Sequence, residues 1–154
     1  MALHKTAARL QERLRRFGLD VEVRELADST RTAAEAAAAV GAEVGQIVKS
    51  LVFVGADGPV VCLCAGDRRV DAAKLGDGAR PARADEVREA TGFAIGGVPP
   101  LGHDRPLPTV VDESLRRFGI LWCAAGTPHA VFSVETEQLL AALPDATVAD
   151  VTEE

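Results

Sequence analysis

Apolar residues recur at steps of three and four in residues 3–17, and this spacing predicts an amphipathic helix that packs one face against a core. In residues 21–26 the pattern changes to an alternation of apolar and charged residues, which predicts a half-exposed strand. Thr32 and Glu35 form a capping-box pattern, so we expect an alanine-rich helix to begin there and to end at Val40.

The strongest pattern is a pair of almost wholly apolar runs, at residues 47–54 and 59–65. The dipeptide Asp57-Gly58 follows the first run and is typical of a tight turn. The two runs therefore predict a β-hairpin in the core of a sheet. Lys49 and Ser50 are the polar residues that interrupt the first run.

The rest of the sequence mixes short helices and strands without a regular strand–helix alternation. Residues 92–108 are rich in glycine and proline and are expected to form a long loop. We expect helices at 71–75, 84–91 and 136–143, and strands at 110–111, 120–125, 130–134 and 147–151. This mixture predicts one α+β domain over residues 1–154, built on a strongly curved mixed sheet with helices packed outside it.

Composition supports a globular protein. Of the 154 residues, 47% are hydrophobic and 26% are charged, and no apolar run approaches the roughly 20 residues of a membrane span. No continuous apolar stretch follows the N-terminus, so we expect no secretory signal and a cytoplasmic location. A buried structural role for Cys62, Cys64 and Cys123 is favoured over metal or redox chemistry. The histidines are too widely spread to predict a metal site, and no cofactor is expected.

The net charge of −6 argues against a broad nucleic-acid surface, but it allows contact with one end of an RNA. Such contact requires only a small rim of cations. The candidate residues for this rim are Lys49, Arg31, Arg68, Arg69 and Lys74. Alternatively, Arg68 and Arg69 are solvated turn residues.

Two features carry candidate chemistry, and each has a structural alternative. Lys49 lies in an otherwise buried strand, where a lysine is usually paired or functional; the alternative is an ammonium that reaches water from the strand edge. Gly96 and Gly97 lie in the proline-stiffened loop, where their N–H groups could hold a carbonyl oxygen that gains negative charge. The alternative is an ordinary turn.

Three further segments carry weaker candidates. His129 follows Gly126 in a segment between two strands, and it is either a base or a residue of a hairpin loop. Asp112 ends a strand and either caps a helix or orients a water molecule. Helix capping explains part of the polar cluster at 29–32, but it does not explain Arg31.

Taken in order, these segments resemble the YbaK and prolyl-tRNA editing-domain family over about residues 5–150. The matching pieces are Ser29-Thr30, residues 44–53, Thr91-Gly92-Phe93, residues 96–102, Asp112-Glu113 and Ala124-Ala125-Gly126. The resemblance implies a barrel-like sheet and hydrolysis of mischarged tRNA, most often tRNA for proline or tRNA that carries alanine, cysteine or serine. The characteristic lysine of the family matches Lys49, whereas Ser50 stands where some members carry asparagine, which leaves the amino-acid preference open.

The resemblance and the residues together imply an ester hydrolase without a metal. We expect Lys49 to hold the tRNA 3′ end or its ribose, the N–H groups of Gly96 and Gly97 to face the carbonyl oxygen, and a water molecule to attack. The expected substrate-binding residues are Ser29, Thr30, Arg31, Ser50, Val98, Pro100, Gly102, Asp112 and Gly126. The expected partners are the acceptor end of an aminoacyl-tRNA and prolyl-tRNA synthetase. Two alternatives stay open: a non-catalytic module that binds aminoacyl-tRNA or an amino acid, and a hydrolase of small esters or amides.

Overall fold

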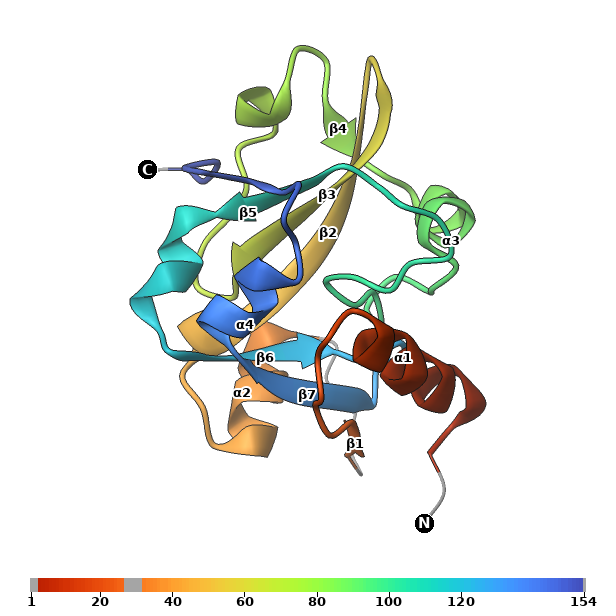
Figure 1. Cartoon of the computed structure of the whole chain (residues 1–154). Helices are drawn as coiled ribbons and strands as arrows, with labels where there is room; N and C mark the ends of the chain where they lie inside the picture. The colour runs from red at the N-terminus through yellow and green to blue at the C-terminus, as the bar shows by residue number, and fades with distance from the viewer. Residues whose placement is uncertain (1–2, 27–31, 154) are drawn as a thin grey trace.

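The computed structural model of the chain describes residues 3–26 and 32–153. An eight-stranded mixed sheet forms its centre, in the order β1-β7-β6-β2-β3-β5-β8, with β4 paired to β2 outside this path (Figure 1). The strands are β1 (Arg24–Glu25), β2 (Ile47–Gly55), β3 (Gly58–Ala65), β4 (Arg80–Pro81), β5 (Thr109–Asp112), β6 (Ile120–Ala124), β7 (Ala130–Glu135) and β8 (Thr147–Ala149). The helices are α1 (Lys5–Arg16), α2 (Ala33–Val40), α3 (Ala84–Thr91) and α4 (Thr136–Ala141), with short 3-10 helices η1 (Val44–Gln46), η2 (Ala72–Leu75) and η3 (Glu113–Arg117). The expected α+β architecture on a mixed sheet is confirmed. The sheet is open, because β1 and β8 end the order of the described strands.

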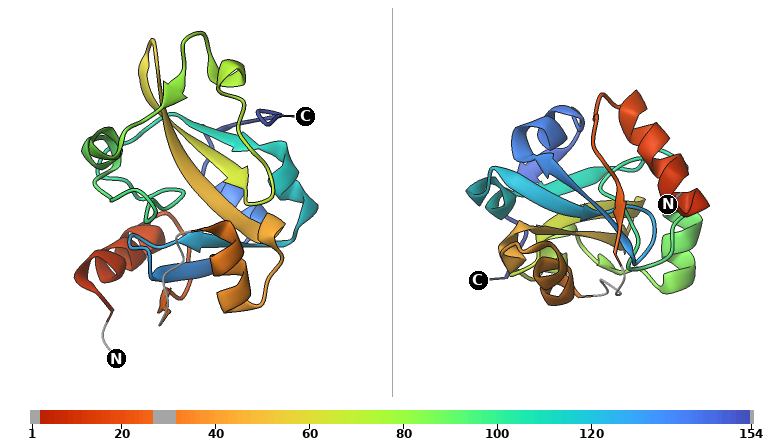
Figure 2. Two further views of the ribbon diagram at one scale, coloured as in Figure 1. Left: turned by 180° about the vertical axis from the view of Figure 1, so that it is seen from behind. Right: turned by 90° about the horizontal axis from the view of Figure 1, so that it is seen from below.

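The central hairpin is β2 and β3, as the two apolar runs predicted. Its antiparallel register runs from Val48↔Ala65 to Gly55↔Gly58. The turn therefore lies one residue earlier than expected, and Gly58 takes a positive φ of 103° that suits glycine. Both strands extend through the middle of the molecule, so residues on the two faces of β2 reach different environments (Figures 1 and 2).

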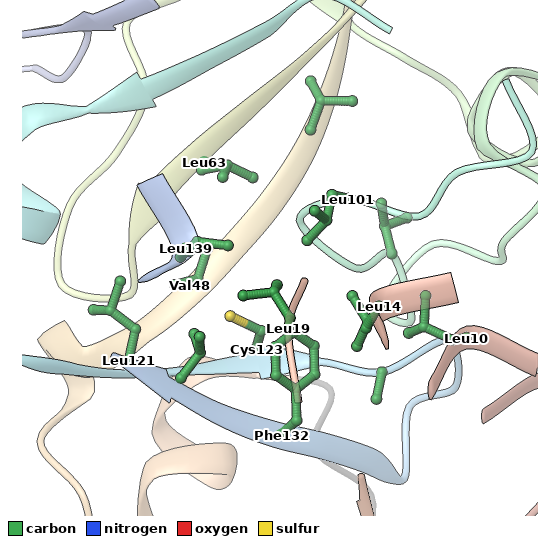
Figure 3. Packing of buried hydrophobic residues seen from close by; sticks show 14 of the residues in the cluster. Leu10, Leu14, Leu19, Val48, Leu63, Leu101, Leu121, Cys123, Phe132 and Leu139 are labelled. Atoms are coloured by element: carbon green, nitrogen blue, oxygen red, sulfur yellow. The ribbon is translucent and has the colours of Figure 1, made fainter. Parts of the chain in front are cut away.

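One face of β2 belongs to the main hydrophobic core. Val48 packs there with Leu10 and Leu14 of α1 and with Phe132 of β7, and all of these side chains are buried (Figure 3). The buried face of α1 follows the predicted spacing of apolar residues, since Ala7, Leu10 and Leu14 lie on one side of the helix.

The opposite face of β2 is covered at its start by α2. Ile47 packs there with Ala36 and Ala37, and the views from the front and from behind show α4 and α2 on opposite sides of β2 (Figures 1 and 2). The predicted cap is confirmed, because Thr32 Oγ1 accepts a hydrogen bond of 3.1 Å from the Glu35 N–H.

Some elements differ from the predicted ones. The strand expected at 21–26 contains only Arg24 and Glu25, which pair with β7. β4 was not predicted, because two residues that include Pro81 carry no alternating pattern and pair with β2 through long-range contacts. Among the described residues, no helix is long and apolar enough to cross a membrane.

β2 changes its partner along its outer edge, and this change creates the opening described below. The edge pairs first with β6, at Ile47↔Trp122 and Val48↔Cys123. It pairs again only at Phe53↔Pro81 and beyond, with β4. Within the described part of the chain, residues 49–52 therefore face no neighbouring strand along this edge.

Candidate functional site

A pocket of about 860 Å³ opens at this gap in the pairing of β2. This volume is within the range of small-molecule sites. Residues of β2, α2, β6 and the glycine–proline loop line it, and most of the lining side chains are apolar. Thr32, Lys49 and Ser50 contribute its hydroxyl and ammonium groups, and Ile95 stands at its edge with 60% of its surface exposed. The site is therefore an apolar cavity with a few polar groups from one strand and one helix terminus.

Lys49 projects from the face of β2 that α2 covers. Neighbouring residues of a strand point to opposite faces, so Lys49 shares a face with Ile47, which packs against α2. The side chain is half-buried, and its Nζ donates a hydrogen bond to the backbone carbonyl of Arg68. The ammonium is thus held beside the turn that follows β3, at one wall of the pocket, rather than extended freely into water.

Ser50 projects from the core face, on the same side as Val48 and Val52. Its Oγ is buried and has no hydrogen-bond partner among the described residues. A buried hydroxyl is almost always paired, so an unpaired one beside a cavity suggests that a ligand supplies the partner.

The glycine–proline loop reaches the pocket through Gly96 and Val98. Gly96 has a φ of +89°, and a Cβ at this position would meet no atom within 4 Å. Gly97 differs, because its N–H donates to the Ala94 carbonyl at 3.0 Å and its own carbonyl accepts from Gly126 at 2.9 Å. The Gly97 N–H is already used within the turn, so its predicted contact with a carbonyl oxygen would require the turn to open. That contact stays a prediction for both glycines.

Three residues expected to touch the substrate lie outside the pocket lining, in packing positions. Gly102 lies against α1, where its carbonyl accepts from Arg13 Nη1 at 2.9 Å. Pro100 is buried. Gly126 has a φ of +98° and joins the β6–β7 turn to Gly97. These residues fix the position of the loop, and the structure shows no contact between them and the cavity.

Asp112 also lies outside the pocket lining, and its geometry matches the capping alternative. The carboxylate is 1% exposed. It accepts from the Ser114 N–H at 3.1 Å and the Val151 N–H at 3.0 Å, and Ser114 Oγ donates to it as well. Asp112 therefore caps η3 and holds the C-terminal segment, which leaves no observed role for it in the pocket.

The comparison with known proteins decides the family. Residues 27–142 match the aminoacyl-tRNA editing domain. The chain belongs to this family. It is therefore an aminoacyl-tRNA editing deacylase, a hydrolase that acts on mischarged tRNA.

Related proteins agree with this assignment. A crystal structure of a protein proposed to be a trans-editing enzyme for prolyl-tRNA synthetase is 50% identical, with a TM-score of 0.92, over 99% of this chain and 100% of that one. EbsC of Enterococcus faecalis, proposed to be a Cys-tRNA(Pro)/Cys-tRNA(Cys) deacylase, is 28% identical over 79% of this chain and 77% of its own length. The proline–tRNA ligase of Lactobacillus gasseri is 40% identical over 46% of this chain, which corresponds to 14% of the ligase.

The cations of the editing domain divide into two groups. Lys49 lines the pocket and donates to the backbone carbonyl of Arg68, whose guanidinium lies 3.9 Å from Asp67. Arg69 and Lys74 instead contact the C-terminal segment, where Lys74 Nζ donates to the Thr152 carbonyl at 2.7 Å and Arg69 lies 3.9 Å from Glu153. Ser29, Thr30 and Arg31 lie outside the described residues.

A further cation near the pocket was missed by the sequence analysis. The Arg24 guanidinium lies 4.9 Å from the ring centroid of Trp122, and Trp122 lines the cavity. The sequence has no local signal for this contact, because it joins β1 to β6, two strands that β7 separates in the sheet. Arginine over tryptophan is a favourable pairing that places positive charge beside an aromatic wall.

The cysteines of the editing domain are buried and carry free thiols, which confirms their expected structural role. Burial raises the pKa of Cys62 to about 12 and that of Cys64 to about 11. Burial also raises the pKa of Cys123, on the pocket wall, well above its usual range. A thiolate is the nucleophilic form of cysteine, so these residues do not provide a covalent nucleophile at neutral pH.

Proposed function

We propose that this editing domain acts in trans on mischarged tRNA for proline and releases a small amino acid, with cysteine, alanine and serine as the candidate residues. One observation carries the proposal: Lys49 and the Gly96 loop, far apart in the sequence, meet at a single apolar pocket. The trans-editing description of the similar crystal structure and the Cys-tRNA(Pro) substrate in the name of EbsC support the choice of tRNA.

The reaction is hydrolysis of the ester between the amino acid and the terminal ribose. The oxygen of a water molecule bonds to the carbonyl carbon, the bond to the ribose oxygen breaks, and a proton from the water passes to that oxygen. The products are a free amino acid and a tRNA with a free terminal hydroxyl. Water is the nucleophile in this proposal because the thiols of the described residues are buried and protonated.

Lys49 supplies the fixed positive charge in this scheme. Its ammonium, held by the Arg68 carbonyl, is positioned to hydrogen-bond the ribose or the terminal phosphate. The Gly96 N–H, at the pocket edge, is the proposed donor to the oxygen that becomes negative in the tetrahedral intermediate. Contact limited to the acceptor end is compatible with the net charge of −6.

We further propose that prolyl-tRNA synthetase supplies the mischarged tRNA in the cytoplasm. The similarity to a segment of the Lactobacillus gasseri ligase supports this partner, because that ligase carries a related sequence within its own chain.

Deacylation of a panel of charged tRNAs tests the proposal. tRNA for proline would be charged with alanine, cysteine, serine or threonine, with prolyl-tRNA as the correctly charged control. We expect rapid loss of at least one mischarged species and a decrease of about 100-fold or more in that rate for Lys49→Ala, the size of effect seen when a group that stabilises the transition state is removed.

The matched control is Lys74→Ala, which removes a lysine that contacts the C-terminal segment instead of the pocket. This variant should deacylate at the wild-type rate. Equal rates for wild type and Lys49→Ala would refute the role of Lys49. Binding of charged tRNA without hydrolysis of any species would refute the enzyme and support a non-catalytic binding module.

A further inference from the structure

The backbone of β2 alternates between groups that bond to β3 and groups that point to the opposite edge. In an antiparallel pair, every second residue exchanges both of its backbone hydrogen bonds with its partner. The backbone N–H and carbonyl of Ile47 point toward β3, since this carbonyl accepts from the Gly66 N–H at 2.8 Å. The backbone groups of Val52 point away from β3, since the Val52 carbonyl accepts from the Ala82 N–H at 2.9 Å. Val61, opposite Val52, likewise points outward and donates to the Pro108 carbonyl at 2.9 Å.

This alternation directs the backbone groups of Val48, Ser50 and Val52 toward the edge that borders the pocket. Val48 is paired with Cys123 of β6, and the Val52 carbonyl is taken by Ala82. Between them, Ser50 directs an N–H and a carbonyl into the gap, and no strand within the described residues lies opposite.

The chain beyond β6 turns away from this position. If β6 continued along β2, the Gly126 N–H would reach the Ser50 carbonyl, but it donates to Gly97 instead. The buried, unpaired Ser50 Oγ lies at the same residue. Within the described residues, Ser50 thus has an unpaired Oγ, and no strand lies opposite its N–H and carbonyl at the wall of an otherwise apolar pocket.

An aminoacyl ester has the same N–Cα–C=O arrangement as one residue of a polypeptide. We infer that the aminoacyl group binds as a one-residue antiparallel partner of Ser50, a minimal case of strand addition to a sheet edge. Its ammonium donates to the Ser50 carbonyl, and its carbonyl oxygen accepts from the Ser50 N–H. This inference rests on the proposed function, and it makes the Ser50 N–H a donor to the developing oxyanion, beside that of Gly96.

The antiparallel direction fixes where the rest of the substrate lies. The ester oxygen continues from the carbonyl toward the N-terminal end of β2, so the ribose lies opposite Lys49. The side chains of a hydrogen-bonded pair lie on the same face of a sheet, so the side chain of an L-amino acid lies beside Ser50 Oγ. A hydroxyl or thiol on the substrate can then satisfy that oxygen, which makes Ser50 a specificity-determining residue.

The gap beside Ser50 accommodates one residue only. Val48 is paired on one side, and the Ala82 N–H occupies the Val52 carbonyl on the other. A substrate with an acylated amine would lose its charge and extend toward Ala82. The geometry therefore selects free aminoacyl esters over N-acylated and peptidyl esters.

Binding can be tested without catalysis by using adenosine that carries L-cysteine in a 3′-amide linkage, which is not readily hydrolysed. With ¹⁵N-labelled protein, we expect the Ser50 amide proton to shift downfield and to exchange more slowly when this compound binds. The N-acetylated compound should bind at least about tenfold more weakly, a difference that corresponds to loss of a charge-assisted hydrogen bond. Binding that leaves the Ser50 amide unchanged would overturn the inference.

Two variants test the same contact in catalysis. Ser50→Pro removes the N–H and should lower kcat/KM by about 100-fold or more, whereas Ser50→Ala keeps the N–H and should stay within about tenfold. Ser50→Ala should also reduce the preference for cysteine or serine over alanine. Equal activity of folded Ser50→Pro and Ser50→Ala would overturn the inference. If Ser50→Pro does not fold, the amide measurement decides.

Failure of the inference can be distinguished from failure of the proposed function. Deacylation by the wild type with an unchanged Ser50 amide would refute the inference alone. A shifted Ser50 amide without deacylation of any charged tRNA would refute the proposed function and support the binding geometry.

Discussion

Two glycines of the glycine–proline loop have similar φ angles but different surroundings. Gly96 and Gly102 have φ values of +89° and +86°. A Cβ on Gly96 would meet open space, whereas a Cβ on Gly102 would lie 2.8 Å from Leu10 Cδ1. The first glycine borders the pocket and the second packs against α1. One loop therefore contains a glycine that can contact a ligand and a second glycine that packs the loop against α1.

The largest effect on stability is expected at Gly97, which follows the pocket-lining Gly96 and packs closely against Gly126. A Cβ there would lie 2.8 Å from the Gly126 carbonyl oxygen, which is backbone and cannot move as a flexible side chain does. We expect Gly97→Ala to lower the free energy of unfolding by about 2–3 kcal/mol, as overpacking does, and to reduce deacylation by displacing the loop. Urea denaturation and a deacylation assay would measure both effects. Unchanged stability would show that the two turns do not need this close contact.

A smaller effect is expected for the variants Gly102→Ala and Gly96→Ala, which should differ in kcat. Alanine is strained at either φ, by about 1–2 kcal/mol, and Gly102→Ala should lose more stability than Gly96→Ala because only its Cβ meets a buried side chain. We expect Gly102→Ala to keep the wild-type kcat when it is folded, and Gly96→Ala to reduce kcat. Thermal unfolding and kcat, measured on the pair, test the comparison directly. A loss of kcat in Gly102→Ala that matched the loss in Gly96→Ala would mean that the loop acts as one unit.

The smallest effect is expected at the turn that holds Lys49. Arg117 Nη2 and Nη1 donate to the Asp67 carboxylate, at 2.7 and 3.0 Å, and Arg117 holds the pKa of Asp67 below its ordinary value. A lowered pKa stabilises the fold above the unfolded pKa, and this stabilisation disappears as the pH falls through the folded value. Because the pair is more than one-third exposed, we expect Asp67→Asn to cost less than about 1 kcal/mol at pH 7.

The difference between wild type and Asp67→Asn should shrink below about pH 4, and urea denaturation across pH would show it. The exposed Asp145 offers the control Asp145→Asn, which should show no such difference. A constant difference between wild type and Asp67→Asn down to pH 2 would contradict the proposed ion pair.

The predictable parts of this fold are those set by neighbours in sequence. The β2–β3 hairpin follows from two apolar runs and a turn, and α2 follows from Thr32 and Glu35. Lys49 was a functional candidate from its position in an apolar run and from the family resemblance, and it lines the pocket.

The missed parts depend on contacts between distant segments. The gap at Ser50 exists because β6 leaves β2 at Cys123 and β4 joins it at Phe53, and neither junction has a local signal. The glycines at 97, 102 and 126 were expected to meet substrate, because glycine permits close approach by a ligand or by another backbone. The sequence does not distinguish these two cases. Gly97 and Gly126 contact each other through their backbones, Gly102 packs against side chains of α1, and contact of these glycines with substrate stays a prediction.

The thiol on the pocket wall has a consequence for product release. An enzyme that frees cysteine works beside a product that an oxidant converts to cystine, and a reactive protein thiolate in the cavity would attack that disulfide, form a mixed disulfide and displace one cysteine. Cys123 is 1% exposed, and burial keeps it protonated. Thiol–disulfide exchange requires a thiolate that can be reached, so this cysteine can contribute its volume to the wall while resisting inactivation by the oxidised, disulfide form of the product.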